Sequence, residues 1–141
     1  MTPEGEGVLI AWDNDHIRGE AVRKGVYCLS IQITLKQSNN SFVLTTVYGP
    51  TNNNDKHAFL AELIGCQPGS RPWLCLGDFN LIYEAQDKNN NNINRAHMRR
   101  FRQALDASEL MEIKLQNRKY TWSNGRRNPT LVKLDRVFCN R

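Results

Sequence analysis

The sequence predicts an α/β protein built on mixed β-sheets, an α+β arrangement in its finer detail. Strand-like and helix-like segments alternate along the chain, which favours parallel strands joined by helices. One pair of neighbouring strand-like segments is separated by a short turn, and a hairpin pairs its strands antiparallel. The 141 residues, 40% of them apolar, are enough for one domain with a hydrophobic core.

Three strand-like segments precede the first helix. The apolar run 8–12 predicts a short buried strand. Residues 26–35 alternate in polarity, and residues 42–48 are rich in β-branched and aromatic side chains. The polar turn 36–40 between these two segments predicts an antiparallel hairpin, which the Gly-Pro pair at 49–50 ends.

Two amphipathic helices are expected. Asp55 is placed to cap the first helix, and the second runs over residues 94–110. The second helix also carries a basic stripe, separate from its apolar stripe, formed by Arg95, Arg99 and Arg102. The apolar stripes comprise Phe59, Leu60, Leu63 and Ile64 in the first helix and Met98, Phe101 and Leu105 in the second.

Three further strands are expected around and after these helices. Residues 73–76 form a short apolar strand that breaks at Gly77-Asp78. Segments 119–122 and 131–139 are strand-like and are joined by a polar loop. Residues 88–94, with four consecutive Asn, form a loop.

Charge is distributed unevenly. Residues 1–94 carry a net charge of −3, whereas residues 95–141 carry +8. A basic half of this kind predicts a polyanionic partner such as nucleic acid. A solvated basic face with no partner is the alternative.

The cysteines and histidines match no metal-binding spacing. No Cys-x-x-Cys pair occurs, and no His-Glu-x-x-His sequence. We therefore expect the cysteines to behave as small buried hydrophobes. The residues concerned are Cys28, Cys66, Cys75, Cys139, His16, His57 and His97.

No stretch approaches the ~20 apolar residues of a membrane span, and residues 1–7 do not begin a secretory signal. We expect an intracellular protein with no membrane partner, and the sequence identifies no protein partner. Strand-like segments lie close to both ends of the sequence, so we expect a piece of a longer chain.

The sharpest local feature is the segment 74–80, in which a buried strand ends in Gly77 and is followed by Asp78 and Asn80. Catalytic side chains gather at such strand ends, because a rigid strand positions them. An Asx turn, in which Asp78 accepts a hydrogen bond from its own backbone, is the alternative. Tyr48, at the end of another strand, can donate to a phosphate.

Five motifs, in this order, resemble the endonuclease/exonuclease/phosphatase superfamily, and within it the apurinic-like endonuclease domain of plant LINE-type (non-LTR) retrotransposons. The resemblance covers nearly the whole chain. The motifs are Tyr-Gly-Pro at 48–50, Pro-Trp to Gly-Asp-Phe-Asn at 72–80, Met-x-x-Phe-x-x-x-Leu at 98–105, Thr-Trp-Ser-Asn at 121–124 and Leu-Asp-Arg at 134–136.

The resemblance implies a DNase I-like, four-layer α/β sandwich that hydrolyses DNA phosphodiesters with Mg²⁺, and hence a nuclear location. It implies that Asp78 activates the attacking water, that Asn80 and Tyr48 hold the phosphate, and that Asp135 orients a histidine. Thr121 and Asn124 would lie on the substrate side. Arg126 and Arg127 are assigned to backbone phosphates from their charge, with a solvated loop as the alternative.

The sequence departs from this family at both ends. The metal-binding Glu and first Asn of the family have no counterpart, since Glu4 and Glu6 lie among glycines with no strand before them. The terminal Ser-Asp-His is also missing, so no metal ligand is assigned. We therefore expect residues 1–141 to be an incomplete domain, catalytically impaired, and whether the chain is itself an enzyme stays open.

Two other functions remain. The first is a non-catalytic remnant that binds nucleic acid through its basic half. The second is the phosphatase branch of the same superfamily, acting on inositol phosphates or sphingolipid, which the Thr-Trp-Ser-Asn and Leu-Asp-Arg motifs disfavour.

Overall fold

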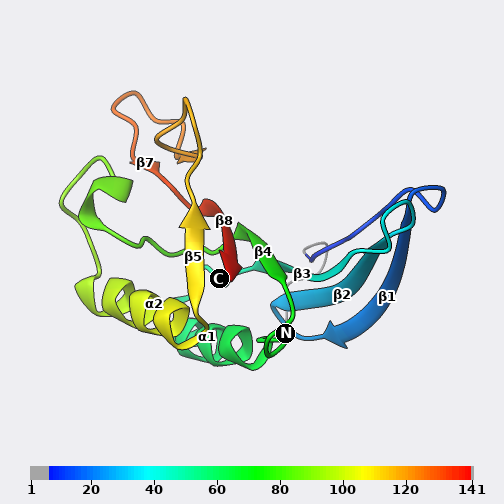
Figure 1. The fold of residues 1–141 in the computed structure, drawn as a ribbon. Coiled ribbons are helices and arrows are strands. Elements are labelled where there is room, and N and C mark those ends of the chain that lie inside the picture. Colours follow the sequence, from blue (N-terminus) through cyan, green and yellow to red (C-terminus); the bar gives the residue numbers. More distant parts are fainter. Residues whose placement is uncertain (1–6, 141) are drawn as a thin grey trace.

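The structure, a computed structural model, describes residues 7–140 and is organised around one six-stranded mixed sheet (Figure 1). β3 and β4 are parallel, and every other neighbouring pair in the sheet is antiparallel. The predicted mixed sheet is thereby confirmed. In sheet order the strands are β1 (Ile17–Lys24), β2 (Cys28–Leu35), β3 (Ser41–Tyr48), β4 (Trp73–Asp78), β8 (Asp135–Asn140) and β5 (Leu110–Ile113).

Two helices, α1 (Lys56–Gly65) and α2 (Arg95–Ala107), lie together on one side of the sheet (Figure 1). Short 3₁₀ turns, η1 (Asn53–Asp55) and η2 (Ala85–Asp87), precede them. A separate two-stranded sheet pairs β6 (Trp122–Ser123) with β7 (Leu131–Val132). Among the described residues, no helix is both long and apolar enough to cross a bilayer.

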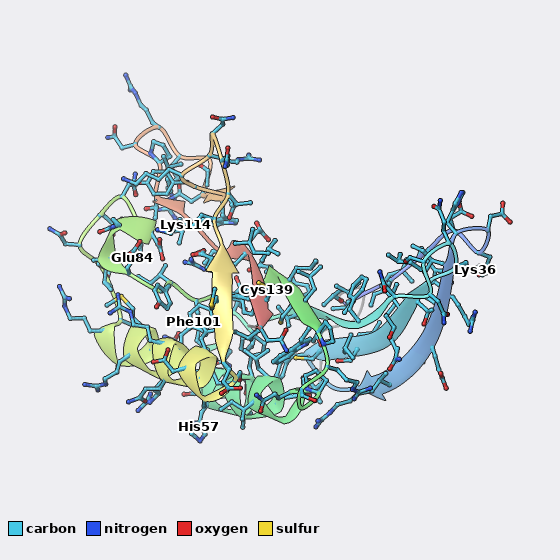
Figure 2. All side chains as sticks on the ribbon, in the orientation of Figure 1. Lys36, His57, Glu84, Phe101, Lys114 and Cys139 are labelled. Carbon is cyan, nitrogen blue, oxygen red and sulfur yellow. The ribbon has the colours of Figure 1, made fainter. Side chains whose placement is uncertain are left out.

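The core between the helices and the sheet contains a group of four phenylalanines, all 2% exposed or less. Phe79 lies 5.1 Å from Phe138 and 5.5 Å from Phe101, measured between ring centroids. Figure 2 shows Phe101 directed from α2 towards the sheet. Phe59 of α1 completes the cluster and tilts against Phe79. The cluster therefore anchors the segment that follows β4.

The predicted strand at 8–12 is wrong. These residues form no strand, and Leu9 is 89% exposed. The first strand of the described residues is instead β1, whose polar side chains gave little strand signal. Trp12 packs over Gly19 of β1, where a Cβ atom would lie 2.7 Å from the indole ring. Trp12 therefore covers part of the sheet, and the run does not join the edge of the sheet.

The predicted hairpin is confirmed as β2 and β3, with Ile31 opposite Leu44. Both helices are also confirmed, with differences at their ends. Asp55 makes no side-chain capping bond, whereas Asn94 accepts one from the backbone N–H of His97. Ile64 of the predicted apolar stripe is 39% exposed, because α1 turns that position towards solvent.

The last third of the chain differs most from expectation. The strand expected at 119–122 is reduced to the two residues of β6. The strand expected at 131–139 is divided into β7 and β8, because Lys133 and Leu134 leave the pairing. Strand β5 was not predicted, since its four residues follow directly after a helix.

A buried ion-pair network ties β8 to its surroundings. Arg136, 2% exposed, donates to Asp87 of η2 and, at 2.9 Å, to Glu112 of β5. Lys133 also donates to Glu112, at 2.7 Å. The Arg of the Leu-Asp-Arg motif therefore joins three segments, and removing one member would leave buried charge uncompensated.

Candidate active site

Three of the predicted catalytic residues lie in one row across three neighbouring strands. Tyr48 at the end of β3 is the register partner of Asp78 at the end of β4. Asp78 is in turn opposite Asp135, the first residue of β8. Register partners on adjacent strands place their side chains on the same face of a sheet. We call Tyr48, Asp78 and Asp135 the strand-end row.

Two glycines allow the strand ends that carry this row to approach each other closely. Gly77 has a φ of +139°, and a Cβ atom there would lie 2.2 Å from the carbonyl oxygen of Val47. A Cβ atom at Gly49 would lie 2.3 Å from the carbonyl oxygen of Phe79. The N–H of Gly49 also donates to the carbonyl of Asp78 at 2.7 Å. Any larger residue would force the strand ends apart.

Asp78 and Asn80 form the Asx turn that the sequence left open. The Oδ1 atom of Asp78 accepts from the backbone N–H of Asn80 at 2.9 Å. Asn80 has a φ of +49°, and its Nδ2 donates to the carbonyl of Gly49 at 2.6 Å. The Asx turn is therefore part of the candidate site, because it fixes Asp78 within the strand-end row and Asn80 beside it.

The surroundings of Asp78 shift its acidity. Burial raises the pKa of this half-buried carboxyl above its ordinary value, and the nearby charge of Asp135 raises it further. The N–H of Asn80 and the ammonium of Lys56 act in the opposite direction. The net raised pKa brings the carboxyl closer to the range in which a general base operates.

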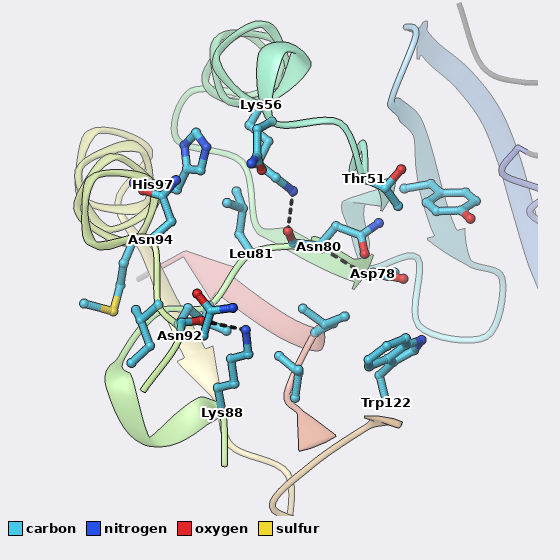
Figure 3. A pocket seen from close by; sticks show the side chains of 17 residues that line it. Thr51, Lys56, Asp78, Asn80, Leu81, Lys88, Asn92, Asn94, His97 and Trp122 are labelled. Atoms are coloured by element: carbon cyan, nitrogen blue, oxygen red, sulfur yellow. Dashed lines mark hydrogen bonds between the residues drawn. The ribbon is translucent and has the colours of Figure 1, made fainter. Parts of the chain in front are cut away.

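Lys56 is a site residue that our sequence reasoning missed. It is 6% exposed, and its Nζ donates to the carbonyl of Pro50 at 2.8 Å. It also donates to the carbonyl of Asn80 at 2.6 Å (Figure 3). Burial lowers the pKa of Lys56, although Asp78 opposes that shift. A signal was present: Lys56 precedes Phe59 and Leu60 by three and four residues, which places it on the buried face of α1.

A cavity of about 430 Å³ opens beside Asp78 and Asn80. Its opposite wall comes from the loop before α2 and from α2 itself, so that His97 faces the site from a distant segment (Figure 3). Burial lowers the pKa of His97, and Lys56 and Arg100 lower it further. Other residues that line the cavity include Tyr48, Lys88, Asn92, Met98 and Trp122.

The predicted substrate-side residues lie apart from this cavity. Thr121 Oγ1 accepts from the backbone N–H groups of Leu134 and Asp135, at 2.9 and 3.1 Å, and so fixes the start of β8. Asn124 Oδ1 accepts from the N–H of Arg126 at 3.1 Å and thereby organises its own loop. The side chains of Arg126 and Arg127 are exposed in that loop.

The residues that could hold a metal ion are few. Within residues 7–140, no group of three or more His, Cys, Asp or Glu side chains could hold one. Asp78 and Asp135, opposite each other, remain as a pair of carboxylates. Mg²⁺ is commonly held by one or two carboxylates, with water and substrate phosphate completing its shell. Asp78 and Asp135 are thus the two carboxylates of the strand-end row that are available to such an ion.

Comparison with known proteins identifies the fold. The model of the Endonuclease/Exonuclease/phosphatase family matches residues 7–141. No curated protein matches the chain.

Solved structures with the same fold are distant in sequence. The endonuclease domain of TRAS1, a telomere-specific non-LTR retrotransposon, superposes with a TM-score of 0.70 at 13% identity, covering 92% of this chain and 58% of that one. The human Nocturnin catalytic domain gives 0.56 at 12%, covering 91% and 50%. D. rerio TDP2, complexed with a single-strand DNA product, gives 0.52 at 13%, covering 89% and 54%. The chain thus spans half to three-fifths of these structures and has a partial DNase I-like fold.

Proposed function

Because this chain belongs to the Endonuclease/Exonuclease/phosphatase family, we propose that it is part of a retroelement DNA endonuclease domain that hydrolyses phosphodiester bonds with Mg²⁺. The observation that carries this proposal is the strand-end row, in which Tyr48, Asp78 and Asp135 occupy one register position. The fold shared with a retrotransposon endonuclease supports DNA as the substrate and the nucleus as the place of action.

Each residue of the row has a chemical role in this proposal. The Oδ1 atom of Asp78 is held by the Asx turn, which directs its second oxygen to orient the attacking water and accept its proton. Tyr48 donates its phenol hydrogen to a phosphate oxygen, and Asn80 donates the Nδ2 hydrogen that Gly49 does not use. Lys56 acts through Asn80 by holding its backbone carbonyl. Asp78 and Asp135 would hold Mg²⁺, which would supply positive charge against the charge of the phosphate.

We propose further that catalysis by this chain alone is slow. Asp135 makes no hydrogen bond to a histidine within residues 7–140, and His97 lies on the opposite wall of the cavity. A positioned acid or base contributes a factor of roughly 10²–10⁴ to a rate. The described residues supply two carboxylates without that partner, so we expect turnover far below that of a complete site.

Nicking of supercoiled plasmid tests the proposal. We expect slow nicking that requires Mg²⁺, stops with EDTA and falls at least about 100-fold in Asp78→Ala. Asp106→Ala is the matched control, because it removes an exposed carboxylate from α2, away from the cavity. Nicking by the purified chain that survives Asp78→Ala would overturn the assignment of the site.

A second function is favoured by the charge distribution, namely binding of nucleic acid without cleavage. Of the basic residues described between positions 95 and 140, Lys133 is engaged in a partly buried ion pair and Arg136 in a buried one. Salt-dependent DNA binding with no nicking above the Asp78→Ala level would favour this function over hydrolysis. The exposed basic residues are Arg95, Arg99, Arg100, Arg102, Lys114, Arg118, Lys119, Arg126 and Arg127.

A further inference from the structure

The six-stranded sheet has two faces, and α1 and α2 both lie against the same one (Figure 1). Successive side chains of a strand point to opposite faces of a sheet. Val43 of β3 and Trp73 and Cys75 of β4 belong to the hydrophobic core on the helix side. The residues that alternate with them therefore lie on the opposite face, which we call the open face.

The open face carries two rows of side chains that run across five strands, from β2 to β5. Within each row, every residue is the register partner of the next, so that the side chains of a row lie on one face. The first row is entirely apolar, and the second is interrupted only by a threonine. The first row consists of Ile31, Leu44, Leu74, Cys139 and Met111. The second row consists of Leu29, Thr46, Leu76, Val137 and Ile113.

The two ends of the open face are covered to different extents. At the β1 end, Trp12 packs over Gly19, and Ile31 is 3% exposed although it lies outside the core on the helix side. At the β5 end, Met111 and Ile113 are 44% and 48% exposed. The row residues of β3, β4 and β8 between these ends are only partly buried. An apolar surface therefore extends without full cover from β3 to β5.

The total accessible surface gives a measure of how much cover is missing. The chain exposes 9174 Å², whereas a compact folded monomer of 16.2 kDa is expected to expose about 7,500 Å². The excess of about 1,700 Å² lies within the roughly 1,000–2,500 Å² that each subunit buries in a large, apolar homodimer interface. Contact with another folded domain is therefore needed to cover it, because a single added strand is too small.

We propose that two copies of this chain associate through their open faces as a two-fold symmetric dimer. A second copy fits because it presents the same apolar rows, and a two-fold axis packs a face against itself so that the assembly closes. Two sheets pack face to face about 10 Å apart and exclude water from both. Tyr48 and Asp78 follow Thr46 and Leu76 by two residues, so they lie at the rim of the open face, and the dimer borders the candidate site.

Sedimentation equilibrium of the intact wild-type chain tests the stoichiometry. We expect a species of twice the 16.2 kDa monomer mass, in equilibrium with the monomer on dilution. Its mass should reach a plateau as the concentration rises, because a face that packs against itself leaves no site for a third copy. A monomer at every concentration would overturn the proposal, and so would a mass that rises without a plateau.

A pair of lysine substitutions locates the interface. Ile113→Lys places a charge on the open face, and Ile64→Lys places the same charge on α1, on the other side of the sheet. The two isoleucines are 48% and 39% exposed, so both variants should fold, which circular dichroism verifies. We expect only Ile113→Lys to raise the dimer dissociation constant, by at least about tenfold, because the dimer buries its charge. Equal dissociation constants in the two variants would rule out the open face.

Cys139 provides a native reporter, because it belongs to the first row, whereas the other three cysteines are buried in the core on the helix side. Iodoacetamide should label Cys139 several-fold more slowly in the wild-type dimer than in Ile113→Lys at the same concentration. Dilution of the wild type to the monomer should abolish the difference. Equally fast labelling in dimer and monomer would contradict the burial of Cys139 between two copies. None of these measurements requires nicking of DNA, so the dimer and the proposed hydrolysis can fail separately.

Discussion

The strand-end row and the loop between β6 and β7 are built differently. The strand-end row of Tyr48, Asp78 and Asp135 is fixed by strand register and by the buried phenylalanine cluster beneath it. The loop between β6 and β7, with Arg126 and Arg127, is held by local hydrogen bonds to Asn124 and is largely exposed. The difference teaches that the sheet positions the groups proposed to react, whereas the loop presents exposed charge.

The row and the segment that leads into the loop are joined at the start of β8. The guanidinium of Arg136 reaches Asp87 and Glu112 from β8, directly after Asp135. Thr121, on the loop side, accepts from the N–H of Asp135. The β8 end of the row is therefore held by the buried ion pair of Arg136 and by the hydroxyl of Thr121. The loop beyond Thr121 has neither contact.

The largest expected effect is a loss of stability when the phenylalanine packing beneath the strand-end row is disrupted. Phe79→Ala should lower the free energy of unfolding by about 3–5 kcal/mol, because Phe79 is fully buried against three other rings. Trp122→Ala, on the loop side and 46% exposed, should cost less than about 1 kcal/mol. Urea unfolding followed by circular dichroism measures both variants. Equal losses would show that β6 is as much a part of the core as β4.

The same contrast explains what the sequence predicts well. The sequence predicts Tyr48, Asp78 and Asn80 at strand ends, because Gly and Pro mark those positions, and the structure places them there. Asp135 comes only from the family resemblance and was expected inside a strand over 131–139, whereas β8 begins at it. Their common register could not be found, because pairing depends on contacts between distant segments.

Other features escaped for a related reason. The apolar run at 8–12 has strand character but finds no partner in the sheet, so its local pattern was overridden by tertiary contacts. Lys56 was missed because a lysine is seldom buried, and only its two carbonyl partners make that burial acceptable.

A smaller effect is expected on the pH dependence of stability at the row. The pKa of Asp78 is raised in the native state, so the native chain binds this proton more tightly than the unfolded chain does. Ionising Asp78 therefore costs stability as the pH rises from its ordinary value of 3.8 through the raised native value. Asp78→Asn removes this cost while its Oδ1 still accepts from Asn80.

We expect the Tm of Asp78→Asn to exceed that of the wild type by a few degrees at pH 7, and the difference to vanish below about pH 4. Thermal melts across this range measure it. Asp106→Asn, which changes an exposed carboxylate, should show no such dependence. A difference that grows towards low pH would mean that the native state favours the carboxylate, contrary to the burial of Asp78.

The smallest effect on stability is expected in the loop between β6 and β7, where the substitutions remove charge but no buried contact. Replacing Arg126 and Arg127 together by Ala should leave the free energy of unfolding within about 0.5 kcal/mol of the wild type, because both side chains are exposed. If both contact DNA phosphates, the log–log salt slope of duplex DNA binding should become shallower by roughly 1.8. Fluorescence anisotropy at several salt concentrations measures it.

Arg99 and Arg100, exposed on α2, provide the matched pair. They carry the same charge but are placed by a helix rather than by a loop. If substituting the α2 pair changes the slope and substituting the loop pair does not, DNA is bound by a rigid basic face, and the loop is merely solvated. If substituting the loop pair changes the slope, DNA is bound by the loop that carries Arg126 and Arg127. In that case the loop binds the phosphate backbone of DNA, and the strand-end row carries out the reaction.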